Sequence, residues 1–166
     1  MDVLALTQKF PQTQNLEGKD MPTFAVNSIE LAEIVQYLRD EQGFDILADL
    51  CGVDWKDRSP RFGVVIHLLS TRHREYVRLH APCVDDAVPT VSSIHPGANW
   101  HEREAWEMFG ITFAGHPDLR HMYLPTEFEG YPLRKDFPLL ARIVKPWPGI
   151  VDVEPMPGVA DDEGGE

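Results

Sequence analysis

Apolar positions in the first half of the chain follow a strand-like pattern and then a helical one. Residues 21–26 are predicted to form a short strand that leads directly into a helix. In that helix apolar residues recur every three or four positions and share one face, while Asn27 or Ser28 can cap the first turn and Gly43 can end the last. We therefore expect an amphipathic helix whose apolar face is formed by Ile29, Leu31, Ile34, Val35 and Leu38.

Three segments rich in β-branched and aromatic residues come next, at 44–55, 61–70 and 74–82. The turn-forming sequence DRSP separates the first two, and the polar sequence TRH separates the last two. Because TRH is short enough for a hairpin, at least that pair should be antiparallel. The pattern predicts a meander within an α+β fold, in which a small mixed or antiparallel sheet packs on helices in two layers.

Two further helices are predicted before the pattern changes. The aspartates at 85–86 are expected to open a short helix that stops near 95–97. A longer helix should follow, because Asn99 and Glu102 have the spacing of a capping box and Gly110 supplies a left-handed stop.

The charges on this longer helix have a purely structural interpretation. Helical spacing places Glu102 on the same face as Trp106 and Phe109. Arg103 and Glu107 lie four positions apart, which favours a surface ion pair. A capping box together with a surface ion pair would account for these charges without any functional role.

Beyond residue 113 the chain becomes rich in proline, and eight of its fourteen prolines lie between 117 and 157. Proline lacks a backbone N–H and fixes φ, so regular helix and central strand are excluded and an extended arm is expected. Its many large apolar groups favour an interface with another protein; the alternative is a strap that folds back over the chain's own sheet. The predicted divisions are a globular domain at 1–113, a partner-binding arm at 114–157 and a flexible acidic tail at 158–166. The apolar and basic residues of the arm are Tyr131, Leu133, Phe137, Leu139, Leu140, Ile143, Val144 and Trp147, with Arg134, Lys135, Arg142 and Lys145.

Composition narrows the classes of function. A formal net charge of -12 disfavours nucleic-acid binding, because the protein would repel the phosphate backbone. The first residues lack the features of a signal or transit peptide, and no window approaches 18 consecutive apolar residues, so we expect neither export nor a membrane span. Cys51 and Cys83 do not have the spacing of a cluster or zinc site and are expected to be reduced core thiols.

Histidine spacing leaves one enzymatic hypothesis open. His95, His101, His116 and His121 lie close in sequence, but no pair has the i, i+4 spacing of the H-E-x-x-H zinc motif. Phosphate-binding glycine loops and the G-x-S-x-G motif are missing as well. A metal-dependent enzyme that uses the first three of these histidines therefore remains an alternative to a non-catalytic protein.

Three motifs together resemble a known family. EREAWEMFG at 102–110, GHPDLR at 115–120 and EGYPLRKDFPL at 129–139 are similar to the signature of the thirty-kilodalton subunit, or C subunit, of respiratory complex I, the NADH:quinone oxidoreductase. This resemblance implies a subunit of the peripheral arm of the complex, without catalytic, cofactor-binding or metal-binding residues of its own. FMN, iron–sulfur clusters, NADH and quinone would belong to partner subunits.

The resemblance also implies partners and a location. The arm would run over the large subunit of the quinone site, beside neighbouring iron–sulfur subunits, on the cytoplasmic side of the bacterial inner membrane, and would touch the membrane only through the complex. Relatives that serve ferredoxin-linked or hydrogenase-type complexes share the family, so the electron donor stays open. The residues that the resemblance assigns to the helix start, to the turn after it and to the docking register of the arm are Glu102, Arg103, Glu104, His116, Pro117, Asp118, Arg120, Tyr131, Pro132, Leu133, Arg134, Lys135, Asp136 and Phe137.

Overall fold

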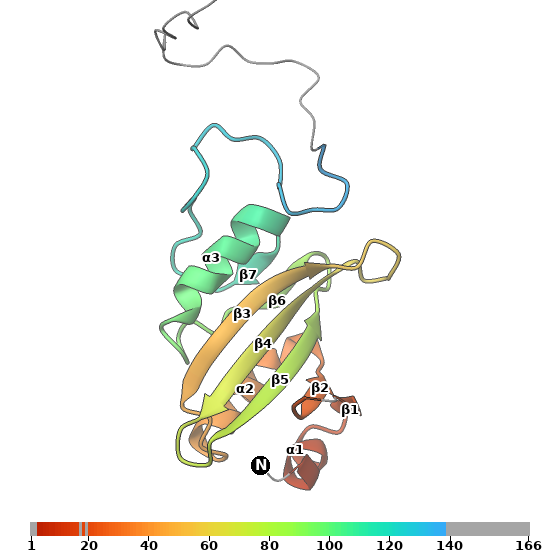
Figure 1. Ribbon diagram of the computed structural model, residues 1–166, viewed down its shortest axis with the longest axis vertical. Coiled ribbons are helices and arrows are strands. Elements are labelled where there is room, and N and C mark those ends of the chain that lie inside the picture. Colours follow the sequence, from red (N-terminus) through yellow and green to blue (C-terminus); the bar gives the residue numbers. More distant parts are fainter. Residues whose placement is uncertain (1–2, 17, 19, 139–166) are drawn as a thin grey trace, which may run out of the picture.

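The main sheet has five strands, and helices pack against one of its faces, in the computed structural model that describes residues 3–16, 18 and 20–138 (Figure 1). Strands β3, β4 and β5 form the antiparallel meander predicted from the sequence. Strand β2 joins β5 in parallel and β1 pairs with β2 in antiparallel, so the sheet is mixed and the predicted α+β class is confirmed. In spatial order the strands are β1 (Gln14–Leu16), β2 (Thr23–Ala25), β5 (Glu75–Pro82), β4 (Phe62–Ser70) and β3 (Ile46–Asp54).

Helix α2 (Leu31–Asp40) covers one face of this sheet, and a single 3-10 turn, η1 (Ser28–Glu30), precedes it. The Asn27 side chain accepts from the Ile29 N–H at 3.0 Å, as the predicted cap requires. Past the helix Gly43 adopts a left-handed φ of 74°, and the backbone N–H of the next residue closes the end by donating to the Leu38 carbonyl.

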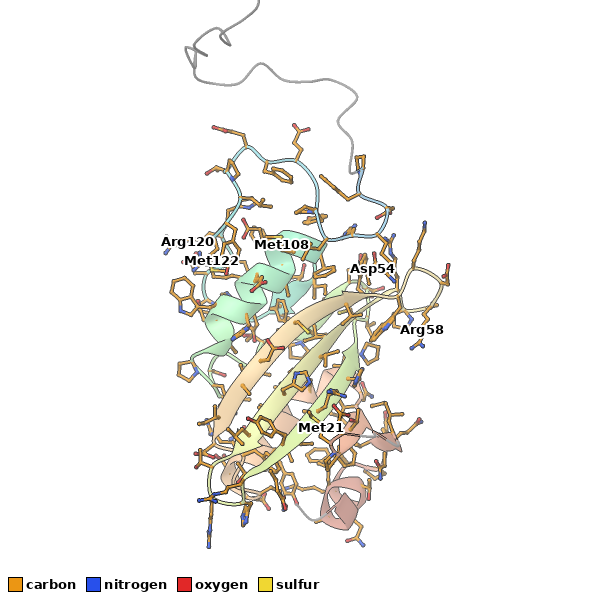
Figure 2. All side chains as sticks on the ribbon, in the orientation of Figure 1. Met21, Asp54, Arg58, Met108, Arg120 and Met122 are labelled. Atoms are coloured by element: carbon orange, nitrogen blue, oxygen red, sulfur yellow. The ribbon has the colours of Figure 1, made fainter. Side chains whose placement is uncertain are left out.

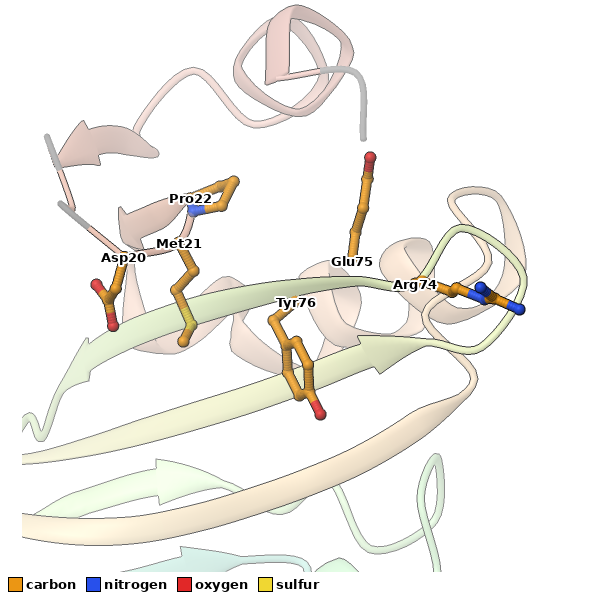
Figure 3. A pocket seen from close by; sticks show the side chains of 6 residues that line it. All are labelled: Asp20, Met21, Pro22, Arg74, Glu75 and Tyr76. Carbon is orange, nitrogen blue, oxygen red and sulfur yellow. The ribbon is translucent and has the colours of Figure 1, made fainter.

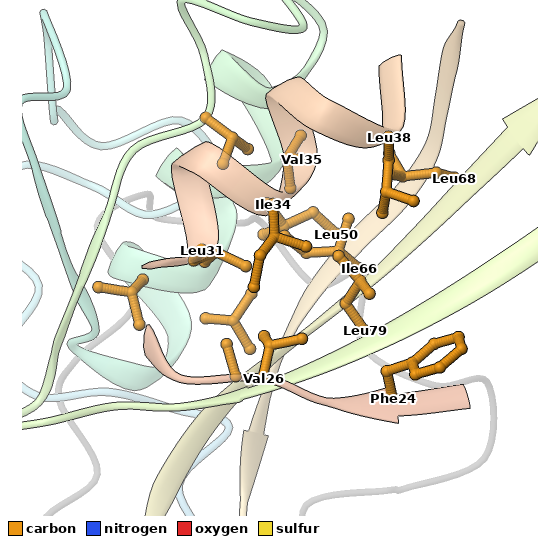
Figure 4. Packing of buried hydrophobic residues seen from close by; sticks show 14 of the residues in the cluster. Phe24, Val26, Leu31, Ile34, Val35, Leu38, Leu50, Ile66, Leu68 and Leu79 are labelled. Carbon is orange, nitrogen blue, oxygen red and sulfur yellow. The ribbon is translucent and has the colours of Figure 1, made fainter. Parts of the chain in front are cut away.

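The main core lies between α2 and the inner face of the sheet (Figure 4). Ile29 was predicted to belong to it, but this side chain is 77% exposed. It lies in the 3-10 turn before α2, where the tighter winding carries it off the buried face. The residues that do pack together include Leu31, Ile34, Val35 and Leu38 from the helix and Leu50, Ile66, Leu68 and Leu79 from the strands.

The helix predicted to start at residues 85–86 is wrong. Asp85 and Asp86 both have positive φ, 51° and 58°, and form a tight turn in which Val84 and Ala87 exchange two backbone hydrogen bonds. Aspartate tolerates this left-handed conformation better than most residues, which suits a hairpin turn of the primed type. The chain then forms β6 (Ala87–Pro89), which pairs in parallel with β7 (Thr112–Ala114).

Helix α3 (Ala98–Phe109) lies against β3 and connects the segment after β6 with β7. The helix and β3 approach closely because Gly52 of β3 has no side chain; an added Cβ there would come 2.6 Å from the Phe109 ring. Gly110 ends the helix with a φ of 75°, as predicted. The predicted capping box is wrong, since Gly97 holds the cap position and Asn99 already lies inside the helix.

Residues 115–138 contain neither helix nor strand, in line with their proline content, and form a looped segment beyond α3 (Figure 1). We call residues 115–138 the described arm. The rest of the predicted arm, 139–157, and the predicted acidic tail lie outside the described residues. The division of the chain into these units stays a prediction. A further helix, α1 (Val3–Lys9), lies at the end of the molecule away from the arm.

Candidate partner-binding arm

Glu107 fixes the first half of the described arm to α3. Its buried carboxylate accepts from the backbone N–H groups of Met122 at 3.1 Å and Leu124 at 2.7 Å, and also from that of Tyr123. His121 Nδ1 lies 3.1 Å from the same carboxylate. Burial by itself would raise the pKa of Glu107, but the converging N–H donors outweigh it and hold that pKa below its ordinary value.

Arg103 makes the neighbouring attachment. Its Nε donates to the Arg120 carbonyl and its Nη2 to the His121 carbonyl, both at 3.2 Å. The side chain is buried and also lies over the Trp100 ring, 5.1 Å from the centroid. The predicted surface ion pair between Arg103 and Glu107 is therefore wrong, because both side chains are buried and bind the arm's backbone.

A three-charge cluster fixes the second half of the described arm. The buried carboxylate of Asp54, at the end of β3, accepts from Arg61 Nε at 2.8 Å and Nη2 at 2.7 Å. The same guanidinium donates to both oxygens of Asp136, at 2.8 and 3.0 Å. Asp54 further accepts from the Lys135 backbone N–H at 2.8 Å. The hydrogen bonds from Arg61 lower the pKa of Asp54 and bring that of Asp136 to about 2.

Arg134 closes the C-terminal end of α3. Its guanidinium lies between two aromatic rings, 4.6 Å from the Phe62 centroid and 4.3 Å from that of Tyr131. Its Nε donates to the Phe109 carbonyl at 2.6 Å, which satisfies a helix-end acceptor and places a cation where the helix dipole favours it. The absence of a side chain at Gly110 makes space for this guanidinium, because an added Cβ there would come 2.5 Å from Arg134 Nη2.

The turn after β7 contains the second family motif. His116 Nδ1 accepts from the Asp118 N–H at 3.0 Å, and its Nε2 lies 3.3 Å from the Asn99 carbonyl. Arg120 Nε lies 3.0 Å from Asp118 Oδ2 in an ion pair on the surface. Pro117 is exposed between them. The predicted role of these residues in fixing the turn stays a prediction.

Glu102 and Glu104 lie on different sides of α3. Glu104 is exposed. Glu102 is fully buried, and accepts from the Val91 N–H at 2.7 Å and the Thr90 hydroxyl at 2.5 Å, instead of from the helix start. Burial raises the pKa of Glu102 to about 7, against the effect of these hydrogen bonds.

With its backbone fixed to the domain, the described arm directs several large side chains to solvent. Tyr123 is 64% exposed and Leu133 is 53% exposed, while Tyr131 and Lys135 are exposed as well. We call these four residues the outer face of the arm; Figure 2 shows the looped segment to which they belong, beyond Met108 and Asp54. Pro132 and Phe137 are half-buried, and Phe137 stacks on Phe128 with ring centroids 6.1 Å apart.

The three histidines of the metal-enzyme hypothesis have different surroundings. His101 lies 3.6 Å from Asp49 and His116 lies near Asn99, while the buried Nε2 of His95 has no hydrogen-bond partner among the described residues. Within the described ranges no group of three or more His, Cys, Asp or Glu side chains could hold a metal ion.

A surface pocket, shown in Figure 3, lies at the start of β5, at the end of the sheet away from the arm (Figure 1). It measures about 420 Å³ and is formed by residues 20–22, before β2, and 74–76, at the start of β5. Neither segment belongs to the family motifs.

Sequence reasoning missed Asp54, Arg61 and Glu107 as anchors of the arm. Asp54 and Arg61 flank the predicted DRSP turn, and their partners lie 75 to 81 positions away, so no local spacing pointed to them. Glu107 was noticed only as a surface charge. An acidic residue at the end of a predicted strand and next to a turn, as at Asp54, is the one signal that could have been used.

The family model described as "Respiratory-chain NADH dehydrogenase, 30 Kd subunit" matches residues 24–142. The chain belongs to this family. The resemblance inferred from the three motifs is thereby confirmed, and the match includes the whole described arm.

Relatives of this family are similar over most of the chain. The C subunit of the NADH-quinone oxidoreductase of Paramagnetospirillum magneticum is 45% identical over 124 residues, which cover 73% of this chain and 62% of that protein. The Rhizobium leguminosarum bv. trifolii protein of the same name is 46% identical over 119 residues, 70% of this chain and 60% of that protein. The chain thus spans about three fifths of the length of these relatives.

Solved structures share the fold. A trypsin-resistant fragment of Nqo5 is 27% identical, with a TM-score of 0.64, and the match covers 70% of this chain and 96% of that one. A chain of an archaeal membrane-bound sulfane sulfur reductase has a TM-score of 0.71 at 22% identity, over 90% of this chain and 96% of that one, and shows the fold alone. None of the helices in the described ranges is long and apolar enough to cross a membrane.

Proposed function

We propose that this chain is a non-catalytic peripheral-arm subunit of a proton-translocating NADH:quinone oxidoreductase. Family membership and the relatives described above, both named as C subunits of an NADH-quinone oxidoreductase, support the choice of complex. The observation that carries the docking role is the arrangement of the arm, whose backbone is fixed to the domain while its outer face is exposed.

The arm, residues 114–157, is the proposed partner-binding part. The anchors hold the backbone of its described part, residues 115–138, in one conformation, so little conformational entropy is lost there when a partner binds the outer face. Tyr123, Tyr131 and Leu133 offer the exposed apolar and aromatic groups that interfaces favour. The side chain of Lys135 adds a positive charge that can pair with an acidic group of the partner.

The proposed partners are the large subunit of the quinone site and neighbouring iron–sulfur subunits. FMN, iron–sulfur clusters, NADH and quinone would all be held by partner subunits. In this arrangement the chain would lie on the cytoplasmic side of the bacterial inner membrane and contact it only through the complex. Its contribution to electron transfer would be to keep the quinone-site subunit in place.

The proposal is tested by purifying the tagged chain with mild detergent from membranes of the organism that encodes it. Co-purifying chains are identified by mass, and NADH:quinone activity is assayed. We expect a large redox complex with that activity. Recovery of the chain alone, from cells in which complex I is intact, would contradict the proposal.

Matched variants test the arm itself. Leu133→Asp and Tyr123→Asp place a charge on the outer face, and Ile29→Asp places one at a similarly exposed apolar position outside the arm. We expect the two arm variants to stop co-purifying with the complex while the melting temperature of the isolated chain stays unchanged. The control should still co-purify with the complex. Equal recovery of the complex by all three would exclude the outer face as the docking surface.

A further inference from the structure

The buried side chain of Glu102 connects three parts of the chain: α3, the segment after β6 and the turn after β7. Its carboxylate, on α3, accepts hydrogen bonds from the Thr90 hydroxyl and the Val91 N–H, which belong to the segment after β6. From the turn after β7, His116 places Nε2 3.9 Å from Glu102 Oε2, and both side chains are fully buried. The described arm begins at this turn.

Two hydroxyl groups connect Glu102 with the surface. The Thr90 hydroxyl lies 2.5 Å from Glu102 Oε2 and 2.8 Å from the Ser92 hydroxyl. Ser92 in turn lines an open groove of about 470 Å³, together with Asn99, Trp100 and other residues. Because a hydroxyl both donates and accepts, this chain can run in either direction. An ionised Glu102 accepts from Thr90, whereas a protonated Glu102 donates to it and Thr90 donates on to Ser92.

The hydrogen bonds of His116 determine where its proton lies. Nδ1 accepts from the Asp118 backbone N–H, so the proton of the neutral ring is on Nε2. That Nε2 has two acceptors in front of it, the Asn99 carbonyl at 3.3 Å and Glu102 at 3.9 Å. A neutral Glu102 leaves the ring bonded to Asn99. An ionised Glu102 attracts the Nε2–H and competes with Asn99 for it.

We propose that Glu102 is a proton-responsive switch for the root of the arm: it exchanges its proton with solvent through Thr90 and Ser92, and its ionisation draws the His116 ring from Asn99 toward the carboxylate. Since the other ring nitrogen holds the Asp118 N–H, movement of the ring changes the turn from which the arm starts. The switch belongs to this chain's own core and does not depend on the proposed complex.

The surroundings of Glu102 favour a change of ionisation near neutrality. The segment after β6 presents only Thr90, Val91 and Ser92, none of which is ionisable, and the turn after β7 presents His116. On α3 itself the positions one turn away, 98, 99, 105 and 106, are uncharged. On β3, Asp49 pairs with His101 instead. Because none of these neighbours in the described part of the chain is a Lys or Arg, burial governs the carboxyl and raises its pKa to about 7.

The test is a pH titration of the full chain by NMR, with isotope labels that report the Glu102 carboxyl carbon and the Asp118 amide. Between about pH 5 and about pH 9 we expect Glu102 to titrate far above the ordinary range of glutamate. The Asp118 amide shift should follow with the same midpoint. A Glu102 carboxyl that is already ionised at the lowest pH, or an Asp118 amide that does not follow it, would overturn the proposal.

Two conservative variants separate the switch from other titrations. Glu102→Gln preserves the shape and cannot ionise, so the pH step at the Asp118 amide should disappear. Glu104→Gln removes an exposed carboxyl two positions along the same helix and should leave the step unchanged. Loss of the step in the second variant, or its persistence in the first, would assign it to another group. The measurement on the unmodified chain decides the matter even if Glu102→Gln fails to fold.

Discussion

Lys135 donates its backbone N–H to the buried carboxylate of Asp54 over 2.8 Å, although 81 positions separate the two residues. The backbone of Lys135 thus binds the domain of its own chain, whereas its side chain is exposed. The arm thus has an inner side that binds the domain and an outer side that is free. Residues 115–138 are attached to α3 and to the end of β3, and a strap over the chain's own sheet stays a prediction, while partner binding remains the proposal for the outer face.

The anchor at Asp54 can be tested by Asp54→Asn. The amide cannot receive the donors of both Arg61 and Lys135 as the carboxylate does, so hydrogen bonds within a buried site are lost. We expect the free energy of unfolding to fall by about 2 kcal/mol, measured by urea denaturation. Asp57→Asn, in the exposed turn between β3 and β4, is the control and should have little effect. Equal effects of the two variants would contradict the anchor.

Arg134 and Lys135 are neighbours with different expected effects. Arg134→Ala removes a hydrogen bond to the Phe109 carbonyl and the contacts with two rings. The free energy of unfolding, measured by thermal denaturation, should therefore fall by about 1 to 2 kcal/mol. Lys135→Ala keeps the backbone hydrogen bond to Asp54 and should leave stability unchanged while weakening recovery of the complex. The double variant would mix the two effects. A loss of stability in Lys135→Ala alone would show that its side chain supports the fold.

Acid should release the second half of the described arm. The folded-state pKa of Asp136 is about 2, below its ordinary value of 3.8, so its stabilising contribution is complete above that ordinary value and disappears as pH falls through about 2. The pKa of Asp54 shifts in the same direction. We expect an acid protease to cleave the arm progressively faster across this range. In Asp136→Asn the arm should be cleaved faster already at the top of this pH range, and the further increase in cleavage rate on acidification should be smaller. An increase as large as in the unmodified chain would mean that other carboxyl groups cause it.

Glu107→Gln should loosen the first half of the described arm. The carboxylate receives several backbone N–H groups at two oxygens, whereas glutamine offers one acceptor oxygen and turns two N–H donors toward the same groups. We expect local stability to fall by about 2 kcal/mol, read from faster hydrogen exchange of the Leu124 amide. Exchange in the β4 strand should not change. A uniform increase across the sheet would mean that Glu107 supports the whole fold.

Several features of the fold followed from the sequence because they depend on neighbouring residues. Periodic apolar positions predicted the buried face of α2, and the short polar link predicted the β4–β5 hairpin. Gly110 was identified as a helix stop because glycine adopts a positive φ at little cost. The failures also have local causes: consecutive aspartates suit both a helix start and a left-handed turn, and the hydrogen bonds to Ala87 decide between them.

Patterns in the sequence were sufficient for α2, the β3–β5 meander and α3, and for the motif residues and the family to which they belong. Only the tertiary structure decided which charges face inward and what they bind. Spacing alone made Glu102 a cap and Glu107 half of a surface pair, whereas the fold buries both against distant backbone N–H groups. The reason is physical, because the energy of a charged side chain depends on burial and on the donors around it. Those donors come from segments that only the folded chain brings together.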